Sequence, residues 1–272
     1  MREFSASPRE MLDSLWRHRF LTATLIHKEV AGRYRGSALG LLWSFFHPLF
    51  MLTVYTFVFS VVFKARWGGG TGSTSEFALL LFAGLIIFNL FAECFLRAPT
   101  LILINANFVK KVVFPLEILP WITLGSAFFH ALISLAVWMI AYTLTNGWPQ
   151  PTAVYLPLIL IPLGMMTMGI SWALASLGVY LRDMAQIVGL LSTVLMFLSP
   201  IFYPVSALPE SFRAVLWLNP LMPAIEMSRE VLFWGNGPDW GPLIAYWIGS
   251  AAMGWGGFAW FQKTRKGFAD VL

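Results

Sequence analysis

The chain has 272 residues, of which 58% are hydrophobic and only 11% are charged. Soluble domains average roughly 45–50% apolar and about 25% charged residues, so a soluble fold would leave too much apolar surface facing water. The composition therefore excludes an ordinary soluble protein and predicts one whose solvent is the lipid bilayer. The formal net charge is +5, and the positions of the positive residues along the chain are more informative than their total.

Residues 1–36 are expected to form a cytoplasmic, amphipathic interface region. Ser7, Pro8 and Glu10 have the spacing of a capped helix start, with Pro8 in the first turn. Apolar and aromatic residues then recur every three or four positions, at Leu12, Trp16, Phe20, Ala23, His27, Val30 and Tyr34. This pattern suits a helix lying in the membrane interface, and a helix packed on a partner protein would show it too. The helix could break near residues 18–22.

Residues 37–272 are expected to form a single transmembrane domain with six spans. Residues 36–63 contain no Asp, Glu, Lys or Arg, and these 28 residues as a helix would extend ~42 Å, enough to cross a bilayer with some tilt. The uncharged stretch 118–181 is divided by the turn residues 146–151 into two spans. The six expected spans are 37–63, 77–97, 117–145, 153–181, 184–203 and 241–262.

The segments between these spans differ in character. Residues 64–76 are rich in Gly, Ser and Thr and predict a loop. Residues 98–117 predict a short cytoplasmic helix or a bent re-entry, because polar residues and a proline interrupt the apolar pattern. Residues 205–238 are apolar but cut by prolines, which predicts short re-entrant helices at about 208–217 and 222–234 on the outer side, before the last span.

The basic residues predict the orientation of the chain. Fourteen of its 18 Lys and Arg residues fall in the segments assigned to one side, which include both ends of the chain. The positive-inside rule therefore places both termini in the cytoplasm.

The sequence offers little that could support catalysis. It contains no GxxxxGK[ST] loop, no HExxH motif, no nucleophile elbow and no metal-spaced His/Cys/Asp cluster. No catalytic residue, metal site or cofactor in this chain is therefore predicted. Cys94 is the only cysteine, so an internal disulfide is excluded. His130 lies within a predicted span, where it would be either a packed histidine or part of a proton relay. Glu93 and Arg97 have the i,i+4 spacing of an ion pair on a helix.

Four motifs carry a resemblance to a known family. They are RYRGSALGLLWSFFHPLFMLTVYTFVFSVVF (33–63), NANFVKKVVFPLEILP (105–120), YLRDM (180–184) and SPIFYPVSALP (199–209). Together they resemble the permease subunits of type 2 ABC exporters, in the branch that exports polysaccharides. One departure is His47, where many relatives have Asn before the proline.

The resemblance implies an all-α fold with six transmembrane helices in the bacterial cytoplasmic (inner) membrane. It also implies a homodimer of this chain on two copies of a separate ABC ATPase, which binds ATP and Mg. The expected substrate is a lipid-linked polysaccharide, foremost an O-antigen lipopolysaccharide precursor, and no nucleic acid partner is expected. The alternatives are a capsule, teichoic acid or small-molecule exporter. Without the resemblance, a membrane enzyme, a channel or a scaffold subunit also stays open.

Aromatic residues of the first span are candidates for lining an oligosaccharide channel, because sugar rings stack on aromatic rings. They are Trp43, Phe46, Phe50, Tyr55 and Phe59. Packing in the core or against lipid would explain them equally. Arg33, Tyr34 and Arg35 are candidates for contact with carrier phosphate or with the membrane interface, since arginine suits phosphate oxygens.

Two further groups are expected from the resemblance and from their positions in the chain. Candidates for ATPase coupling are Asn105, Asn107, Lys110, Lys111, Arg182 and Asp183. Candidates for an outer gate are Pro204, Phe212, Pro220, Glu226 and Arg229.

Overall fold

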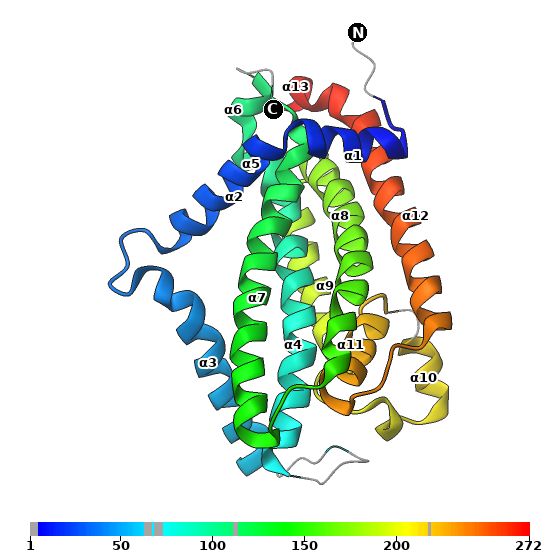
Figure 1. The fold of residues 1–272 in the computed structure, drawn as a ribbon. Helices are drawn as coiled ribbons and strands as arrows, with labels where there is room; N and C mark the ends of the chain where they lie inside the picture. Colours follow the sequence, from blue (N-terminus) through cyan, green and yellow to red (C-terminus); the bar gives the residue numbers. More distant parts are fainter. Residues whose placement is uncertain (1–4, 63–66, 68–72, 111–113, 217–218) are drawn as a thin grey trace.

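A computed structural model describes residues 5–62, 67, 73–110, 114–216 and 219–272. Every regular element in those ranges is a helix (Figure 1), which confirms the expected all-helical fold. Four helical stretches are long and apolar enough to cross a membrane: Gly40–Phe59, Ser75–Ile104, Leu116–Asn146 and Pro151–Tyr180. The six-span count stays a prediction for the remaining two segments.

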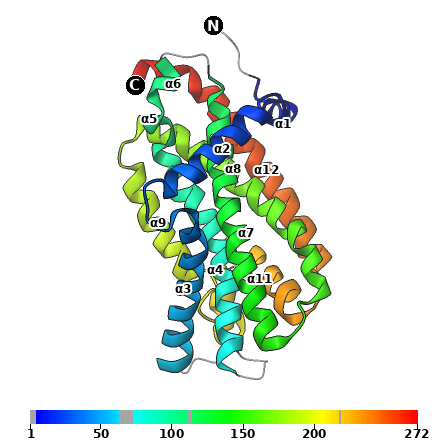
Figure 2. The same cartoon turned by 60° about the vertical axis from the view of Figure 1, so that its left-hand side comes forward.

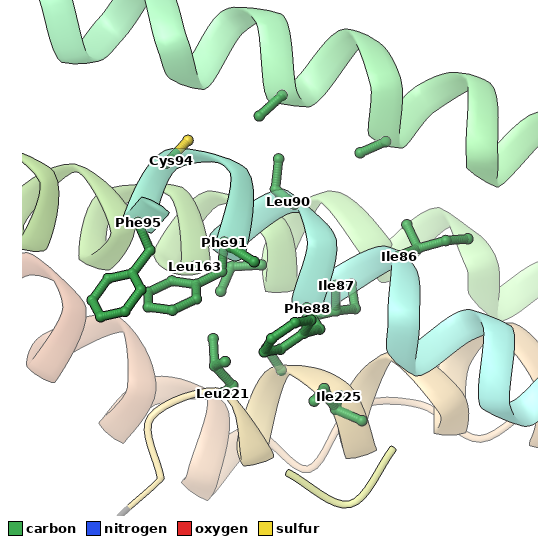
Figure 3. Packing of buried hydrophobic residues seen from close by; sticks show 14 of the residues in the cluster. Ile86, Ile87, Phe88, Leu90, Phe91, Cys94, Phe95, Leu163, Leu221 and Ile225 are labelled. Carbon is green, nitrogen blue, oxygen red and sulfur yellow. The ribbon is translucent and has the colours of Figure 1, made fainter. Parts of the chain in front are cut away.

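The central helix of the bundle is α4 (Thr74–Arg97). It packs against α7 (Leu119–Asn146), α8 (Leu156–Tyr180), α9 (Met184–Leu198) and α11 (Met222–Arg229). Figure 3 shows Phe88 and Phe91 of α4 beside Leu221 and Ile225, with Leu163 of α8 nearby. Because α4 has neighbours on several sides, its sequence is apolar around almost its whole circumference rather than on one face.

The N-terminal region forms two helices, α1 (Pro8–Arg17) and α2 (Arg19–Tyr34). The break at His18 lies in the interval where the sequence allows one, and the Ser7 hydroxyl accepts a hydrogen bond from the Glu10 backbone N–H at 3.1 Å. Trp16 and Phe20 are 71% and 74% exposed. Such an exposed aromatic face at the ends of two short helices suits the interface of a bilayer.

The first span is a succession of short helical pieces. Residues 37–39 lie outside any helix, and the span begins with η1 (Gly40–Leu42), continues as α3 (Trp43–Tyr55) and ends in the π-helical η2 (Thr56–Val62). Gly36 and Gly40 both have positive φ angles, of 84° and 51°, which glycine adopts without strain. They form the elbow between α2 and α3, which stands out from the bundle, whereas both helices pack on α7 away from the elbow (Figure 1).

The fifth segment is shorter than the predicted 184–203. Its helix α9 ends at Leu198, because Pro200 lacks an N–H and does not continue a helix. Fifteen residues extend only ~22 Å, less than the ~30 Å of a bilayer core. Residues 199–204 are therefore a turn instead of the end of a span.

The remaining elements lie at the two ends of the bundle. At the end that holds both chain termini are η3 (Ala98–Thr100), α5 (Leu101–Ile104), α6 (Ala106–Lys110), η4 (Leu116–Ile118), η8 (Arg265–Gly267) and α13 (Phe268–Val271). Toward the opposite end are η5 (Pro151–Tyr155), η6 (Val205–Ala207), α10 (Glu210–Leu216), α11 and η7 (Glu230–Trp234) (Figure 1). The last long helix, α12 (Trp240–Thr264), connects the two ends.

Candidate functional site

Three of the first-span aromatic residues share an open surface on α3. Trp43, Phe46 and Phe50 are 46%, 42% and 66% exposed. They line an apolar groove of about 600 Å³ together with Leu39, His47, Leu49 and Thr53. This face could receive a second protein chain, lipid or a passing ligand.

The other two candidate channel residues are partly buried and pack against the hydrophobic core. The ring of Phe59 stacks on Phe77 of α4 and on Phe202, with ring centroids 5.9 and 5.5 Å apart. Tyr55 lies beside Phe59 at 6.4 Å. These rings hold the end of the first span against α4 and the turn after α9, so the structure separates them from the exposed Trp43 face.

A cluster of charged side chains joins α2, α4 and α7. Arg33 donates to Glu93 at 2.5 Å, and Nδ1 of His130 lies 3.1 Å from the other carboxylate oxygen of Glu93. Arg33 also contacts His130 at 3.0 Å, and Arg97 pairs with Glu29 at 2.5 Å. The sequence indicated the Glu93–Arg97 pair, here 3.7 Å apart, but not the roles of Glu29 and His130, which come from distant helices.

This cluster changes what is expected of the three candidate phosphate-contact residues, Arg33, Tyr34 and Arg35. Arg33 is already bound to a carboxylate, whereas the side chain of Arg35 is exposed. Tyr34 lies edge-on to His130, with ring centroids 6.1 Å apart. Burial raises the pKa of the Tyr34 phenol, although the charge of Arg33 acts in the opposite direction.

The candidate coupling residues are distributed over two elements. Asn105 donates to the Leu101 carbonyl at 2.9 Å, and Asn107 is exposed on α6. Lys110 ends α6, and Lys111 lies outside the described residues. Arg182 and Asp183 are exposed in the turn between α8 and α9. Tyr180 just before this turn donates to the Thr264 carbonyl at 2.9 Å, so the turn lies near the end of α12.

A second ionic group at the same end was not foreseen. Arg265 donates to Glu117 at 2.7 Å, and the Ser14 hydroxyl donates to the other oxygen of Glu117 at 3.0 Å. This group connects the N-terminal helix α1, the start of α7 and the end of α12. The sequence carried a faint signal, since Glu117 is an acidic residue that directly precedes a long uncharged span.

Arg229, a candidate gate residue, is buried among backbone carbonyls. Its guanidinium donates to the carbonyls of Leu80 at 2.9 Å and Ile201 at 3.0 Å, and to Glu226 at 2.7 Å. It also lies 4.4 Å from the centre of the Trp67 ring. The side chain thus fastens α11 to α4 and to the turn after α9.

The other candidate gate residues are more accessible. Phe212 on α10 is exposed, and Pro204 and Pro220 are partly buried. Glu226 is partly buried and borders a cavity of about 250 Å³ between α11 and the start of α12. Only Arg229 of this group is enclosed by the protein.

Comparison with known proteins places these features in a family. The family model described as ABC-2 type transporter matches residues 21–233. The O-antigen export system permease protein RfbA of Myxococcus xanthus is 28% identical over 264 residues, covering 96% of this chain and 99% of that protein. A protein of the same name from Klebsiella pneumoniae is 28% identical over 255 residues, covering 93% and 95%.

A further relative is the polysialic acid transport protein KpsM of Escherichia coli. It is 26% identical over 220 residues, covering 78% of this chain and 80% of that protein. The family match includes α2, all of α3 to α11 and nearly all of η7. The chain therefore belongs to the ABC-2 type transporter family.

Proposed function

We propose that this chain is the membrane permease subunit of an ATP-driven polysaccharide exporter. The observation that carries the proposal is the similarity to O-antigen export permeases over almost the full length of both chains. The exposed aromatic groove on α3 supports it, because an apolar surface of this kind suits the faces of sugar rings.

The proposed substrate is a lipid-linked polysaccharide, foremost an O-antigen lipopolysaccharide precursor. Relatives named for O-antigen export align over 96% and 93% of this chain, whereas KpsM aligns over 78%. Export of a capsule polysaccharide is the second candidate, and the KpsM similarity is the observation that favours it.

Energy for transport is proposed to come from a separate ABC ATPase that binds ATP and Mg. The sequence contains no P-loop of its own. Two copies of the ATPase would serve two copies of this chain, because a two-fold homodimer is the commonest closed assembly. Exposed apolar residues on α9, among them Leu190 and Phe197, offer a surface that a second copy could cover.

The proposed location is the bacterial cytoplasmic membrane, with both termini in the cytoplasm. The termini, α6 and the turn at residues 182–183 would then face the ATPase. The excess of Lys and Arg in the segments assigned to this side supports the orientation. The helices α10 and α11 would lie in the outer half of the membrane, where they could form a gate.

The polymer is proposed to slide along Trp43, Phe46 and Phe50. Stacking on ring faces tolerates shifts in register, which a moving chain requires, whereas fixed hydrogen bonds would hold it at one position. Removing one ring should slow export, and removing all three should stop it.

The test is export in cells that lack the native permease gene and carry the triple variant Trp43→Ala, Phe46→Ala and Phe50→Ala. A matched control removes comparable exposed surface from α7, through Leu132→Ala, Ile140→Ala and Leu144→Ala. Lipid-linked polymer that reaches the outer surface is measured at equal permease levels. Normal export by a well-folded α3 variant would exclude this face from the pathway.

A further inference from the structure

A second, polar cavity lies behind α3. It has a volume of about 530 Å³, is open on one side and is lined by residues of α2, α3, α4 and α7. Arg33, Glu93 and His130 form one part of its wall, and Trp43 and His47 form another. Unlike the apolar groove on α3, this cavity therefore combines ring faces with hydrogen-bonding groups.

Asn89 on α4 is the feature that requires an explanation. Its neighbours Phe88 and Leu90 are only 4% and 2% exposed, but Asn89 is exposed and lines the cavity. It lies near the middle of the apolar stretch Ser75–Ile104, where lipid cannot satisfy an amide. Among the described residues no group hydrogen-bonds to this side chain. The cavity must therefore supply water or a polar ligand to it.

The charged groups around the cavity favour an uncharged ligand over an anion. Arg33 is bound to Glu93, and Arg97 is bound to Glu29 immediately beside it. The two positive groups of this cluster are thus matched by two carboxylates, and a free anion would find no excess positive charge. The site suits an uncharged polar ligand better than a phosphate.

The remaining wall groups match a sugar. The rings of Trp43 and Tyr34 offer faces for the C–H side of a pyranose. The Asn89 amide both donates and accepts hydrogen bonds, as sugar hydroxyls do. His47 adds an exposed imidazole with the same double capacity.

We propose that this cavity binds one uncharged sugar unit of the exported polymer, with Asn89 bonded to its hydroxyls and Trp43 stacked on its ring. The inference rests on the proposed function and adds to it a specific sugar site behind α3. Trp43 borders both the cavity and the apolar groove, so a polymer on the exposed face of α3 could insert one unit here.

The first test compares export by Asn89→Leu and Asn146→Leu. Both replace an asparagine amide with an apolar group of similar size, but Asn146 lies at the far end of α7 and outside the cavity. Loss of the sugar contact should lower export by Asn89→Leu about tenfold, whereas Asn146→Leu should export normally. Normal export by a well-folded Asn89→Leu variant would overturn the proposal.

The second test measures whether polymer occupies the cavity. Asn89→Cys is made in a Cys94→Ala background and is treated with a charged, water-soluble methanethiosulfonate reagent, which reacts with ionised thiols. Ile140→Cys, on the exposed surface of α7, is the lipid-facing control and should not react. The residue 89 thiol should react in cells that make no polymer and should be protected in cells that make it.

Three results would contradict the sugar site. They are no reaction at position 89, no protection by polymer, and equal protection in cells that make the carrier lipid but add no sugar to it. The third result would assign the cavity to the carrier head group. The proposed function fails separately, if cells with the wild-type permease and its ATPase export no polymer at all.

Discussion

Arg229 combines a full positive charge with almost complete burial, at 2% exposure. Its guanidinium donates hydrogen bonds to three backbone carbonyls, those of Leu80, Pro200 and Ile201, and to the carboxylate of Glu226. Backbone at the turn after α9 has no helical partners, and a buried carbonyl without a donor is costly. The fork of the guanidinium supplies several donors at once, which a lysine could not do in the same geometry.

Replacing Arg229 should therefore destabilise the packing of α11 on α4. We expect Arg229→Met to lower the stability of the purified protein by roughly 3 kcal/mol, because three buried carbonyls lose their hydrogen-bond donor. The measurement is the apparent melting temperature in detergent. Arg213→Met is the control, since the hydrogen bonds of Arg213 to described residues go to the carbonyls of Leu208 and Ser206, close to it in the chain. Equal losses in the two variants would contradict this role.

At the scale of helices, the most extensive contact between described helices joins α8 and α12. A Cβ atom added at Gly257 would lie 1.9 Å from the carbonyl oxygen of Gly169, and one added at Gly169 would lie 2.2 Å from that of Met253. The two backbones approach closely because neither helix carries a side chain there. Close approach of this kind is a common basis of helix association in membranes.

Gly257→Ala should force α8 and α12 apart, whereas Gly256→Ala should not. The two positions are adjacent in the same helix, and a Cβ at Gly256 meets no atom within 4 Å. We expect a loss of about 1–3 kcal/mol for Gly257→Ala, as for other overpacked sites, and little change for the control. The yield of monodisperse protein and its melting temperature measure the difference. Indistinguishable variants would show that the helices accommodate a methyl group.

At the scale of the whole molecule, the two ends of the bundle carry different elements. Both termini lie at one end, and α10 lies at the other (Figure 2 shows the same bundle turned by 60°). Helices α1 and α2 lie across the first end rather than along the bundle (Figure 1). Cysteine labelling can test which end of the bundle faces the cytoplasm.

A cysteine at Ser211 should react with impermeant reagents only from outside the cytoplasmic membrane. Ser211 is exposed on α10, and Cys94 is buried, so a Cys94→Ala background removes the only native thiol. Ser5→Cys is the matched control and should react only after the membrane is opened. Reaction of the residue 211 thiol from the cytoplasmic side alone would reverse the proposed topology.

Charge reversal at Lys110 and Lys111 should lower transport without preventing membrane insertion. Lys110 is the last residue of α6, at the end proposed to meet the ATPase, and Lys111 is the next residue of the sequence. Glu in place of both should weaken the association, which co-purification of the ATPase measures. Arg in place of both keeps the charge and is the control. Unchanged co-purification and export in the Glu variant would show that these lysines serve only to orient the chain.

Local patterns in the sequence were sufficient for the elements themselves. The capped start at Ser7 and the proline-cut segment around α10 and α11 follow from short-range rules on capping and proline. The length of α9 was overestimated, because the apolar residues after Leu198 continue the hydropathy pattern of a span. Hydropathy does not register the helix-ending effect of Pro200.

The sequence by itself determined that this chain is a helical membrane protein, because hydropathy and proline act within a few residues of the chain. Only the tertiary structure decided which polar groups meet. Arg33, Glu93 and His130 are separated by 60 and 37 positions along the chain, yet they form one cluster. The tertiary structure likewise separated the exposed Trp43 face from Phe59, which is partly buried and packs on Phe202. The physical reason is that a helical periodicity gives each residue a direction around its own helix, whereas the neighbour in that direction depends on how the helices pack.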